Sequence, residues 1–339
     1  MKTAIVTTTV TAPQSIWLLA KSSPQATLFV AADRKTPKAC ADLCGEYGNV
    51  KFIPVEEQAK WKCSEPIGWN CIQRRNIALL EAVKWGADLI VSWDDDNLPL
   101  VRNYAACFQS FPEQFGLAVE SPWLNVGALC HPPFRHRGFP VSQDPNSYSV
   151  VPVTDARVGV VAGLAFGDPD ISAIDRISQA PQTMYASELL RNNVLFQPKP
   201  GQWTVYNTQS TAFVRELAPA MFCAPQFQRF DDIIASLICQ RVMRDLGYAV
   251  RFGQPFVHQQ RHPHNLAKDL REEQWGVENI EHIARRLDKV SLRTAESVTR
   301  QVRLLYQELD DWQEVPASTC AVVDAFLDDM EGALDATGN

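Results

Sequence analysis

The sequence predicts an α/β protein with a mostly parallel sheet flanked by helices and a helical extension at the C-terminus. Strand-like and helix-like segments alternate through the first half of the chain, a succession that favours a parallel sheet. From about residue 270 the pattern is helical, with charges at salt-bridge spacing. We therefore expect a catalytic, ligand-binding domain over residues 1–269 and a helical extension over residues 270–339.

The strands of the first half are short and rich in β-branched and apolar residues. TAIVTTTV near the start of the chain, TLFVAAD ending at Asp33, and VKFIPV are predicted to form three strands. DLIVSW, residues 88–93, is a nearly continuous apolar run, which is typical of a strand covered on both faces. Ligands of such sheets bind beyond the carboxyl ends of the strands. Asp33 and Asp94–Asp96 lie at two of these ends.

Two helices with clear apolar periodicity are predicted before the C-terminal extension. In WNCIQRRNIALLEAVKWGA, residues 69–87, the apolar side chains of Ile72, Leu79, Leu80 and Val83 fall near one helix face. FDDIIASLICQRVMRDLGY has the same spacing, and Gly247 ends it.

The middle of the chain, about residues 121–230, is rich in Pro, Gly, Asn and Gln and is predicted to consist of loops with short strands. PQTMYASELLRNN within it is predicted as a short helix. AVRFGQPFV, residues 249–257, is predicted as a strand. The helical extension contains LREEQWGVENIEHIARRLDKV, LRTAESVTRQVRLLYQELDDW and CAVVDAFLDDMEGAL, and these segments are candidates for self-association into a homo-oligomer.

The composition is that of a soluble protein with a core and an acidic surface. Apolar residues make up 46% of the chain, and the formal net charge is −7. This balance argues against non-specific binding to nucleic acid or to an anionic membrane, since both need a basic face. No apolar run is long enough for a membrane-spanning helix, and MKTAIVTTTV lacks the apolar stretch of a signal peptide. Nine cysteines without paired CxxC spacing favour reduced thiols, a cytoplasmic location and no zinc site.

The acidic triplet Asp94–Asp96 is the first candidate for chemistry. Hard cations such as Mg²⁺ and Mn²⁺ prefer oxygen ligands and commonly join one or two carboxylates to substrate phosphates. Asp94 and Asp96 at a strand end are therefore candidate metal ligands, and the cation would offset the repulsion within the triplet. The alternative is a solvated acidic turn.

Two charged pairs open the predicted helices. Arg74 and Arg75 lie in the first turns of a helix, where a cation is unfavourable unless an anion meets it, so they are candidates for binding a diphosphate. The alternative is a surface arginine pair. Asp231 and Asp232 open the second helix, where anions complement the helix dipole. One of them could cap the helix while the other acts as a base or accepts a hydrogen bond from a sugar hydroxyl.

Two basic stretches complete the set. FVHQQRHPHNLAKDL follows a predicted strand and offers a third metal ligand and phosphate contacts, with His258 and Arg261 as the candidates. A structural role for these histidines is the alternative. FRHRGFPVS, residues 134–142, is a basic loop in an acidic protein.

Together these stretches resemble nucleotide-sugar enzymes with the GT-A type of Rossmann-like fold. AADRKTP and QRRNIALLEAVKWGADLIVSWDDDN resemble the N-terminal core of the STELLO-type glycosyltransferase-like proteins. RGFPVS after the triplet, then RFDD and GQPFV, resemble the reversibly glycosylated polypeptides, the UDP-arabinopyranose mutases of glycosyltransferase family 75. The resemblance covers roughly residues 3–275 by motif order.

The resemblance implies a role for each matching residue. Asp94, Asp95 and Asp96 would serve a Mn²⁺ or Mg²⁺ ion and the nucleotide, with His258 as a further metal ligand. Asp33 would lie near the base or ribose, and Arg137 would match the arginine that becomes glycosylated in the mutases. Asp231 and Asp232 would line the sugar side. The remaining candidate contacts to the nucleotide-sugar are Arg74, Arg75, Asn76 and Arg261.

Three functions follow as hypotheses. The first is a metal-dependent enzyme acting on a UDP-sugar, most similar to a UDP-arabinopyranose mutase. The second is a glycosyltransferase that moves a sugar to an acceptor hydroxyl. The third is a non-catalytic partner protein that binds nucleotide-sugars. Asn97 and Leu98 stand where the mutases have Cys-Phe, and this difference keeps the second hypothesis open.

Overall fold

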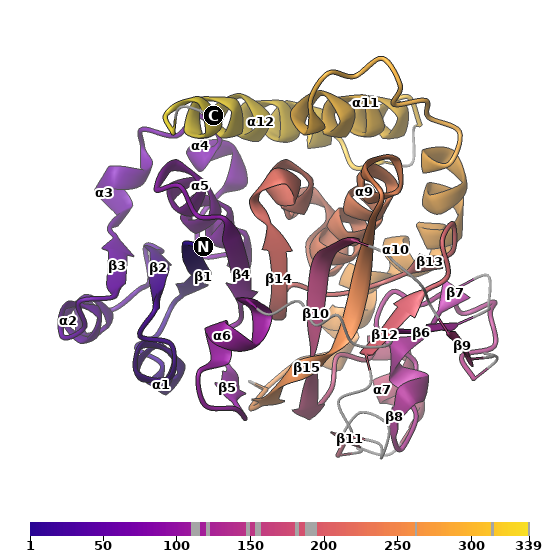
Figure 1. Cartoon of the computed structure of the whole chain (residues 1–339), viewed down its shortest axis with the longest axis horizontal. Coiled ribbons are helices and arrows are strands. Elements are labelled where there is room, and N and C mark those ends of the chain that lie inside the picture. The colour runs from indigo at the N-terminus through magenta and orange to yellow at the C-terminus, as the bar shows by residue number, and fades with distance from the viewer. Residues whose placement is uncertain are drawn as a thin grey trace.

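One large sheet forms the centre of this computed structural model (Figure 1). The structure describes residues 1–109, 116–119, 123–146, 150–152, 157–179, 183–186, 195–261, 263–312 and 315–337. In sheet order the strands are β3 (Val50–Ile53), β2 (Ala26–Ala32), β1 (Thr3–Thr9), β4 (Leu89–Trp93), β14 (Ser210–Val214), β10 (Arg157–Gly167), β15 (Tyr248–Gln259), β12 (Leu195–Pro198), β6 (Gly116–Val119) and β9 (Val150–Pro152), with β5 (Asn97–Pro99) paired to β15.

The strand directions place most carboxyl ends at one edge of the sheet. β3, β2, β1 and β4 pair in parallel. β14 runs antiparallel to both β4 and β10, and β15 is parallel to β10. Only β14 is therefore reversed among the first seven strands of the sheet order. The predicted fold class, a mostly parallel α/β sheet flanked by helices with helices at the C-terminus, is confirmed.

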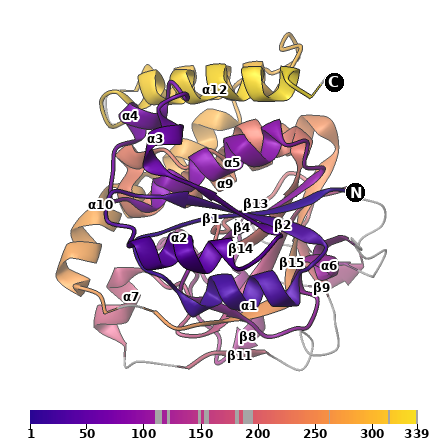
Figure 2. The ribbon, with the colours of Figure 1, turned by 90° about the vertical axis from the view of Figure 1, so that its left-hand side faces the viewer.

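Helices cover both faces of the sheet, as Figure 2 shows. α1 (Gln14–Ser22), α2 (Lys38–Gly45) and α6 (Tyr104–Gln109) pack on one face, and α5 (Arg75–Lys84) and α9 (Asp231–Leu246) on the other. Successive residues of a strand point to opposite faces. In β1, accordingly, Ile5 joins the core beneath α1, whereas Ala4 and Val6 join the core beneath α5.

Short elements connect these layers. They are α3 (Val55–Gln58), α4 (Ser64–Ile67), η1 (Ile72–Arg74), β7 (Trp123–Leu124), η2 (Val126–Leu129), β8 (Cys130–His131), α7 (Ala173–Ser178), β11 (Tyr185–Ala186), β13 (Trp203–Thr204), η3 (Arg215–Met221) and η4 (Pro225–Phe230).

The C-terminal helices α10 (Leu266–Leu287), α11 (Val298–Asp310) and α12 (Thr319–Asp335) are confirmed, and they pack on the body of the protein. α12 lies outside α5 (Figure 2), while α10 and α11 contact α9. Their apolar side chains belong to the same hydrophobic core as α5 and α9. Within the described part of these helices, Leu270 is the one large apolar residue that is exposed, so self-association through them stays a prediction. The predicted boundary at residue 270 between a catalytic domain and a helical extension likewise stays a prediction.

This outer layer explains one wrong expectation. The apolar side chains of α5 were expected near one face, but nearly every residue from Arg75 to Val83 is buried, and Ile72 before it is 47% exposed. The sheet covers one side of α5 and α12 covers the other. A helix between two apolar layers has no polar face, so its periodicity does not show which side is solvated.

The middle of the chain differs most from expectation. Residues 157–167, expected within loops and short strands, form the 11-residue strand β10 at the centre of the sheet. The short helix expected over residues 181–193 is wrong where the structure describes it, because Tyr185 and Ala186 form β11, paired to β8. Residues 181–182 and 187–193 lie outside the described residues. In the described residues, no helix is long and apolar enough to cross a membrane.

A close packing contact between α10 and η4 depends on Gly276. A Cβ atom at this position would lie 2.1 Å from Cδ1 of Phe230, a buried ring. We expect Gly276→Ala to lower the free energy of unfolding by about 1–3 kcal/mol, because the helix must move away from the ring. Urea denaturation measures the change. Gly332→Ala in α12 is the matched control: no atom lies within 4 Å of its added Cβ, and it should be neutral or stabilising. Equal effects of the two substitutions would contradict the packing argument.

Candidate functional site

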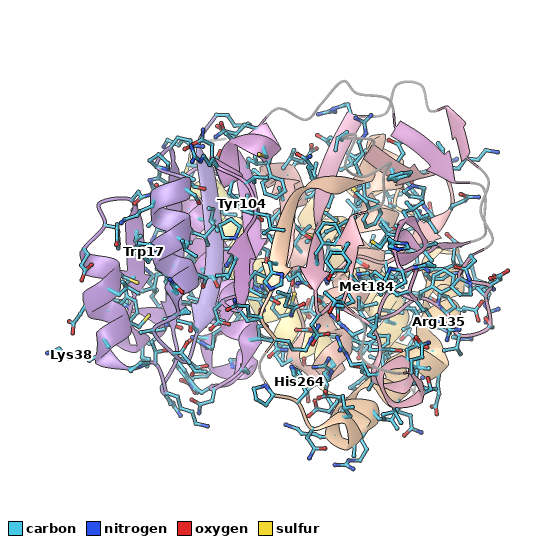
Figure 3. All side chains as sticks on the ribbon, turned by 90° about the horizontal axis from the view of Figure 1, so that it is seen from below. Trp17, Lys38, Tyr104, Arg135, Met184 and His264 are labelled. Carbon is cyan, nitrogen blue, oxygen red and sulfur yellow. The ribbon has the colours of Figure 1, made fainter. Side chains whose placement is uncertain are left out.

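A cavity of about 520 Å³ opens at the carboxyl edge of the sheet. It collects residues that follow β4, β10 and β15 and residues that open α5, α9 and α10. Figure 3 views the molecule from the side of α1 and α6, with Trp17 and Lys38 at one end, His264 near the lower edge and Arg135 toward the other end. The volume is in the range of small-molecule sites.

The three aspartates of the triplet have different partners. Asp94 forms an ion pair with Arg75, whose guanidinium also donates to the Thr208 hydroxyl at 2.9 Å. Asp95 accepts a hydrogen bond from the Thr9 hydroxyl at 2.5 Å. Asp96 accepts one from the Gln259 amide at 3.2 Å. All three line the cavity, so the tight turn after β4 presents three carboxylates to one space.

Asp96 has an unused ligand atom. Its Oδ1 is buried and has no hydrogen-bond partner among the described residues. Burial and the neighbouring Asp94 carboxylate raise the pKa of Asp96 to about 6. Leaving a buried oxygen without a partner is costly. The site would therefore gain from a cation or a donor at this atom.

Arg137 is a buried arginine that also lines the cavity. The Arg137 guanidinium donates to Asp170 at 2.8 Å and to both carboxylate oxygens of Asp232 at 3.0 Å, and it also donates to the Arg229 carbonyl. Burial alone would lower the pKa of Arg137, but the two carboxylates raise it well above its usual value. The same pairing lowers the pKa of Asp170 despite its burial. Arg137 is therefore a fixed cation.

Asp231 is the one carboxylate of this region with a pKa near neutrality. It accepts hydrogen bonds from the Gln73 amide at 2.7 Å and from the backbone N–H of Asp232 at 2.8 Å. Burial and the adjacent Asp232 carboxylate raise its pKa to about 7. At neutral pH it is present in both protonation states, as a general acid or base requires.

Several lining residues carry no motif and were not expected. Asp170 is one; others are the amide side chains of Asn207, Gln209 and Gln259, which form a chain of hydrogen bonds that ends at Asp96. Asp170 had a visible signal: it follows the apolar run of β10 as the triplet follows β4. The amides had none, because isolated Asn and Gln residues are common in loops.

The structure brings eight of the predicted residues to this cavity and places four elsewhere. The eight that line it are Arg75, Asp94, Asp95, Asp96, Arg137, Asp231, Asp232 and Arg261. The other four are Asp33, Arg74, Asn76 and His258.

Those four residues have structural contacts. Asp33 accepts hydrogen bonds from the backbone N–H groups of Asn70 and Cys71, which tie the loop before α5 to β2. Arg74 is fully buried and donates to the Ser64 carbonyl at 2.6 Å, beneath the ring of Trp69. Asn76 donates to the Cys223 carbonyl at 2.9 Å. His258 lines a neighbouring cavity.

These positions bear on the expected metal. Among the described residues, no three His, Cys, Asp or Glu side chains form a group that could hold an ion by themselves. Asp94 and Asp96 remain, and His258 does not join them. Two carboxylates suffice for Mg²⁺ or Mn²⁺ only when substrate phosphates complete the coordination. The free Oδ1 of Asp96 fits such a shared site.

The fold and the cavity define an α/β protein with an acidic, arginine-rich binding site at the carboxyl ends of its strands. No protein-family model matches the chain, and no curated protein matches it. Among solved structures it is similar to S. aureus TarS 1–349 in complex with UDP (9% identity, TM-score 0.35). It is also similar to the complex of that protein with UDP-GlcNAc (10% identity, TM-score 0.39). Each alignment covers 99% of this chain and 91% of the other. At these TM-scores, no residue role is transferred to this chain.

The raised pKa of Asp231 predicts a pH-dependent stability. The folded state holds the proton up to about pH 7, whereas the unfolded chain loses it near pH 4, so folding loses stability as the pH rises between these values. Asp231→Asn does not titrate. Its free energy of unfolding relative to the native chain should therefore rise by about 2 kcal/mol between pH 5 and pH 8, measured by urea denaturation. Asp42→Asn, at an exposed position of α2, should show no such trend. A pH-independent difference for Asp231→Asn would contradict the raised pKa.

The contacts of Arg137 predict a structural cost for its removal. Arg137→Ala leaves Asp170 and Asp232 buried without their cation, and it should lower the free energy of unfolding by about 3–5 kcal/mol. Arg137→Lys keeps the charge but cannot bridge both carboxylates, so its loss should be smaller. The control is Arg34→Ala, which removes an exposed ion pair with Glu65 of 3.9 Å and should change stability by less than about 0.5 kcal/mol. Native stability in Arg137→Ala would show that the two carboxylates do not depend on this arginine.

Proposed function

We propose that the chain is a nucleotide-sugar enzyme that transfers a sugar from a UDP-sugar to an acceptor hydroxyl, with a divalent cation as cofactor. The observation that carries the proposal is the meeting, in one cavity, of the strand-end triplet and the near-neutral carboxylate Asp231. A leaving diphosphate needs charge neutralisation, and an attacking hydroxyl needs a base. The cavity thus contains both carboxylates that could hold a neutralising cation and a carboxylate that could act as the base.

The charge of the cavity favours a cation as cofactor. Five cationic side chains and seven carboxylates line it, which gives a formal charge of −2 when all carboxylates are ionised and His264 is neutral. The cations are Arg75, Arg137, Arg229, Arg261 and Lys268; the acids are Asp94, Asp95, Asp96, Asp170, Asp231, Asp232 and Glu272. A diphosphate would be repelled by this excess. Mn²⁺ or Mg²⁺ held by Asp94 and Asp96 would cancel it and stabilise the diphosphate as a leaving group.

Side chains of the cavity supply the other roles in the transfer reaction. The acceptor oxygen forms a bond to the anomeric carbon, and the bond from that carbon to the diphosphate breaks, with its electron pair leaving on the diphosphate. The hydroxyl proton passes to the Asp231 carboxylate, which Gln73 orients through its 2.7 Å hydrogen bond. Asp232 pairs with Arg137 and so holds the wall next to Asp231. Arg261, on the far side of Gln259, is a candidate contact to phosphate.

A UDP-arabinopyranose mutase, the activity implied by the resemblance, is the second candidate. The observation that favours it is that Arg137 of RGFPVS lines the same cavity as the triplet. Attachment of a sugar to Arg137 requires a neutral guanidinium nitrogen, however, and the contacts with Asp170 and Asp232 keep the group protonated. A mutase would therefore have to free Arg137 from these carboxylates first.

Metal-dependent UDP binding tests the assignment of Asp96. In calorimetric titrations with Mn²⁺, Asp96→Asn should weaken UDP binding at least ten-fold, equivalent to about 1.4 kcal/mol, because it removes a ligand charge. With EDTA in place of the metal, the native chain and the variant should bind UDP equally weakly. Asp42→Asn controls for the loss of one surface charge. UDP affinity of the native chain that does not depend on Mn²⁺ would remove the metal from the proposal.

The products then separate the three functions. The native chain is incubated with Mn²⁺ and UDP-sugars, including UDP-arabinopyranose, with and without added sugars as acceptors. UDP release that depends on an acceptor supports the transferase, and a furanose form of the UDP-sugar on chromatography supports the mutase. Tight UDP binding with neither product supports the non-catalytic partner.

A further inference from the structure

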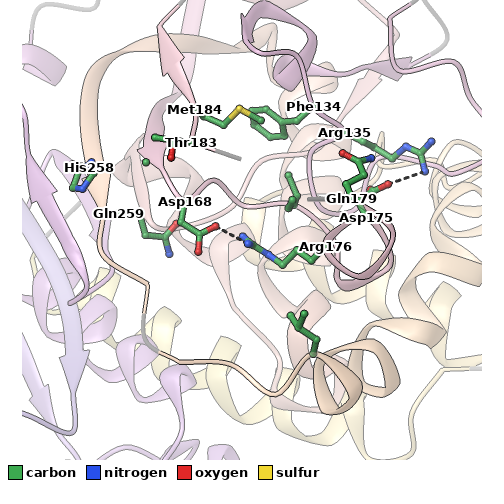
Figure 4. A pocket seen from close by; sticks show the side chains of 13 residues that line it. Phe134, Arg135, Asp168, Asp175, Arg176, Gln179, Thr183, Met184, His258 and Gln259 are labelled. Carbon is green, nitrogen blue, oxygen red and sulfur yellow. Dashed lines mark hydrogen bonds and ion pairs between the residues drawn. The ribbon is translucent and has the colours of Figure 1, made fainter. Parts of the chain in front are cut away.

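A second cavity, of about 480 Å³, lies beside the first (Figure 4). It has an apolar part formed by Phe134, Met184, Ile171 and Leu266. Its polar part consists of Arg135, Asp168, Asp175, Arg176, Gln179, Thr183, His258 and Gln259. In Figure 4, Phe134 and Met184 lie together at the top, the Asp168–Arg176 pair lies below them and the Arg135–Asp175 pair lies to the right.

The two cavities share a wall. Gln259 lines both, and its side-chain amide donates to Asp96 at 3.2 Å. Arg261 of the first cavity forms an ion pair of 3.3 Å with Asp168 of the second. A ligand in the second cavity would thus lie next to the side chain that contacts the proposed metal ligand.

This wall is closely packed. Gly167 has a φ of +87°, and a Cβ atom there would lie 2.6 Å from Cε1 of His258. The glycine therefore lets the His258 ring rest directly on the backbone that leads to Asp168. This contact holds the His258 ring at the cavity wall, so packing against Gly167 explains where the ring lies.

The charges of the second cavity cancel in pairs. Arg176 and Asp168 are 2.6 Å apart, and Arg135 and Asp175 are 3.7 Å apart. A charged ligand would meet a like charge in either pair. A hydroxyl group both donates and accepts hydrogen bonds, so it can contact the carboxylate and the guanidinium of one pair together. The half-buried Phe134 ring offers an apolar face to the C–H groups of a sugar ring.

We propose that the second cavity binds the acceptor of the transfer reaction and that this acceptor is a neutral, hydroxyl-rich carbohydrate. The proposal rests on the proposed function and names the substrate class that it leaves open. The shared Gln259 wall would bring an acceptor hydroxyl to the first cavity, which Asp231 also lines.

Cavity-filling substitutions test the proposal. Gln179 and Thr183 are exposed at the cavity and form none of its ion pairs, so Gln179→Trp and Thr183→Trp should fill it without breaking the network. The control is Gln274→Trp, at an exposed position of α10 that does not line the cavity. Saturation-transfer NMR is recorded on the full chain with saturating UDP and Mn²⁺. The probes are neutral sugars (glucose, arabinose, N-acetylglucosamine, maltose and lactose) and charged ones (glucuronic acid, glucose 6-phosphate and glucosamine).

The expected result is saturation transfer to at least one neutral sugar in the presence of UDP, reduced at least three-fold in both cavity variants and unchanged in Gln274→Trp. The proposal is overturned by transfer to charged sugars alone, by no transfer to any neutral sugar, or by signals that both cavity variants retain.

A second readout separates this inference from the function on which it rests. Calorimetric UDP affinity and hydrolysis of UDP-sugar without added acceptor depend on the first cavity alone, so both should be native in the two cavity variants. If UDP binds as proposed but neutral-sugar signals survive the filling of the cavity, the acceptor site is wrong and the nucleotide site stands. If UDP fails to bind the native chain while the neutral-sugar signals are lost in the cavity variants, the nucleotide assignment fails instead.

Discussion

The buried ion pairs of Arg137 hold the cavity together. One guanidinium joins the loop after β8, the segment after β10 and the first turn of α9 through Asp170 and Asp232. Each carboxylate would be costly to bury alone, and so would the arginine. The three segments are far apart in the sequence, and no other side chain in the described residues pairs with both acids. Asp231 owes its environment to this arrangement, because burial and the adjacent Asp232 carboxylate raise its pKa.

The carboxylates of the cavity outnumber its cationic side chains. Asp94 already has a cation in Arg75, whereas Asp96 has only an amide donor and an unused oxygen. A divalent ion is the simplest group that would satisfy this oxygen and also attract a diphosphate. The amide chain from Gln209 through Gln259 holds the Asp96 carboxylate in place without neutralising it. Such a site is suited to binding metal and nucleotide together.

The sequence predicts the fold where local patterns decide the outcome. β4 was expected because DLIVSW is short, apolar and followed by charges, and the C-terminal helices because their periodicity is long. β10 is mostly apolar, like β4. Its glycines and the Pro-rich residues around it, however, led to a prediction of loops in place of a central strand. Arg74 and Arg75 illustrate the same problem for the site. They are adjacent in one turn, yet one points into the protein beneath Trp69 and the other reaches Asp94, and only tertiary packing decides which.

α12 covers the outer side of α5, so the cavity depends on a helix that is distant from it in the sequence. α5 begins with Arg75, the partner of Asp94, and most of its surface is apolar. During synthesis, α5 is made before α12, so its outer side is exposed until α12 has formed. The part of the cavity that α5 forms therefore reaches its final surroundings only after α12 has packed, and until then the nascent chain exposes an apolar surface.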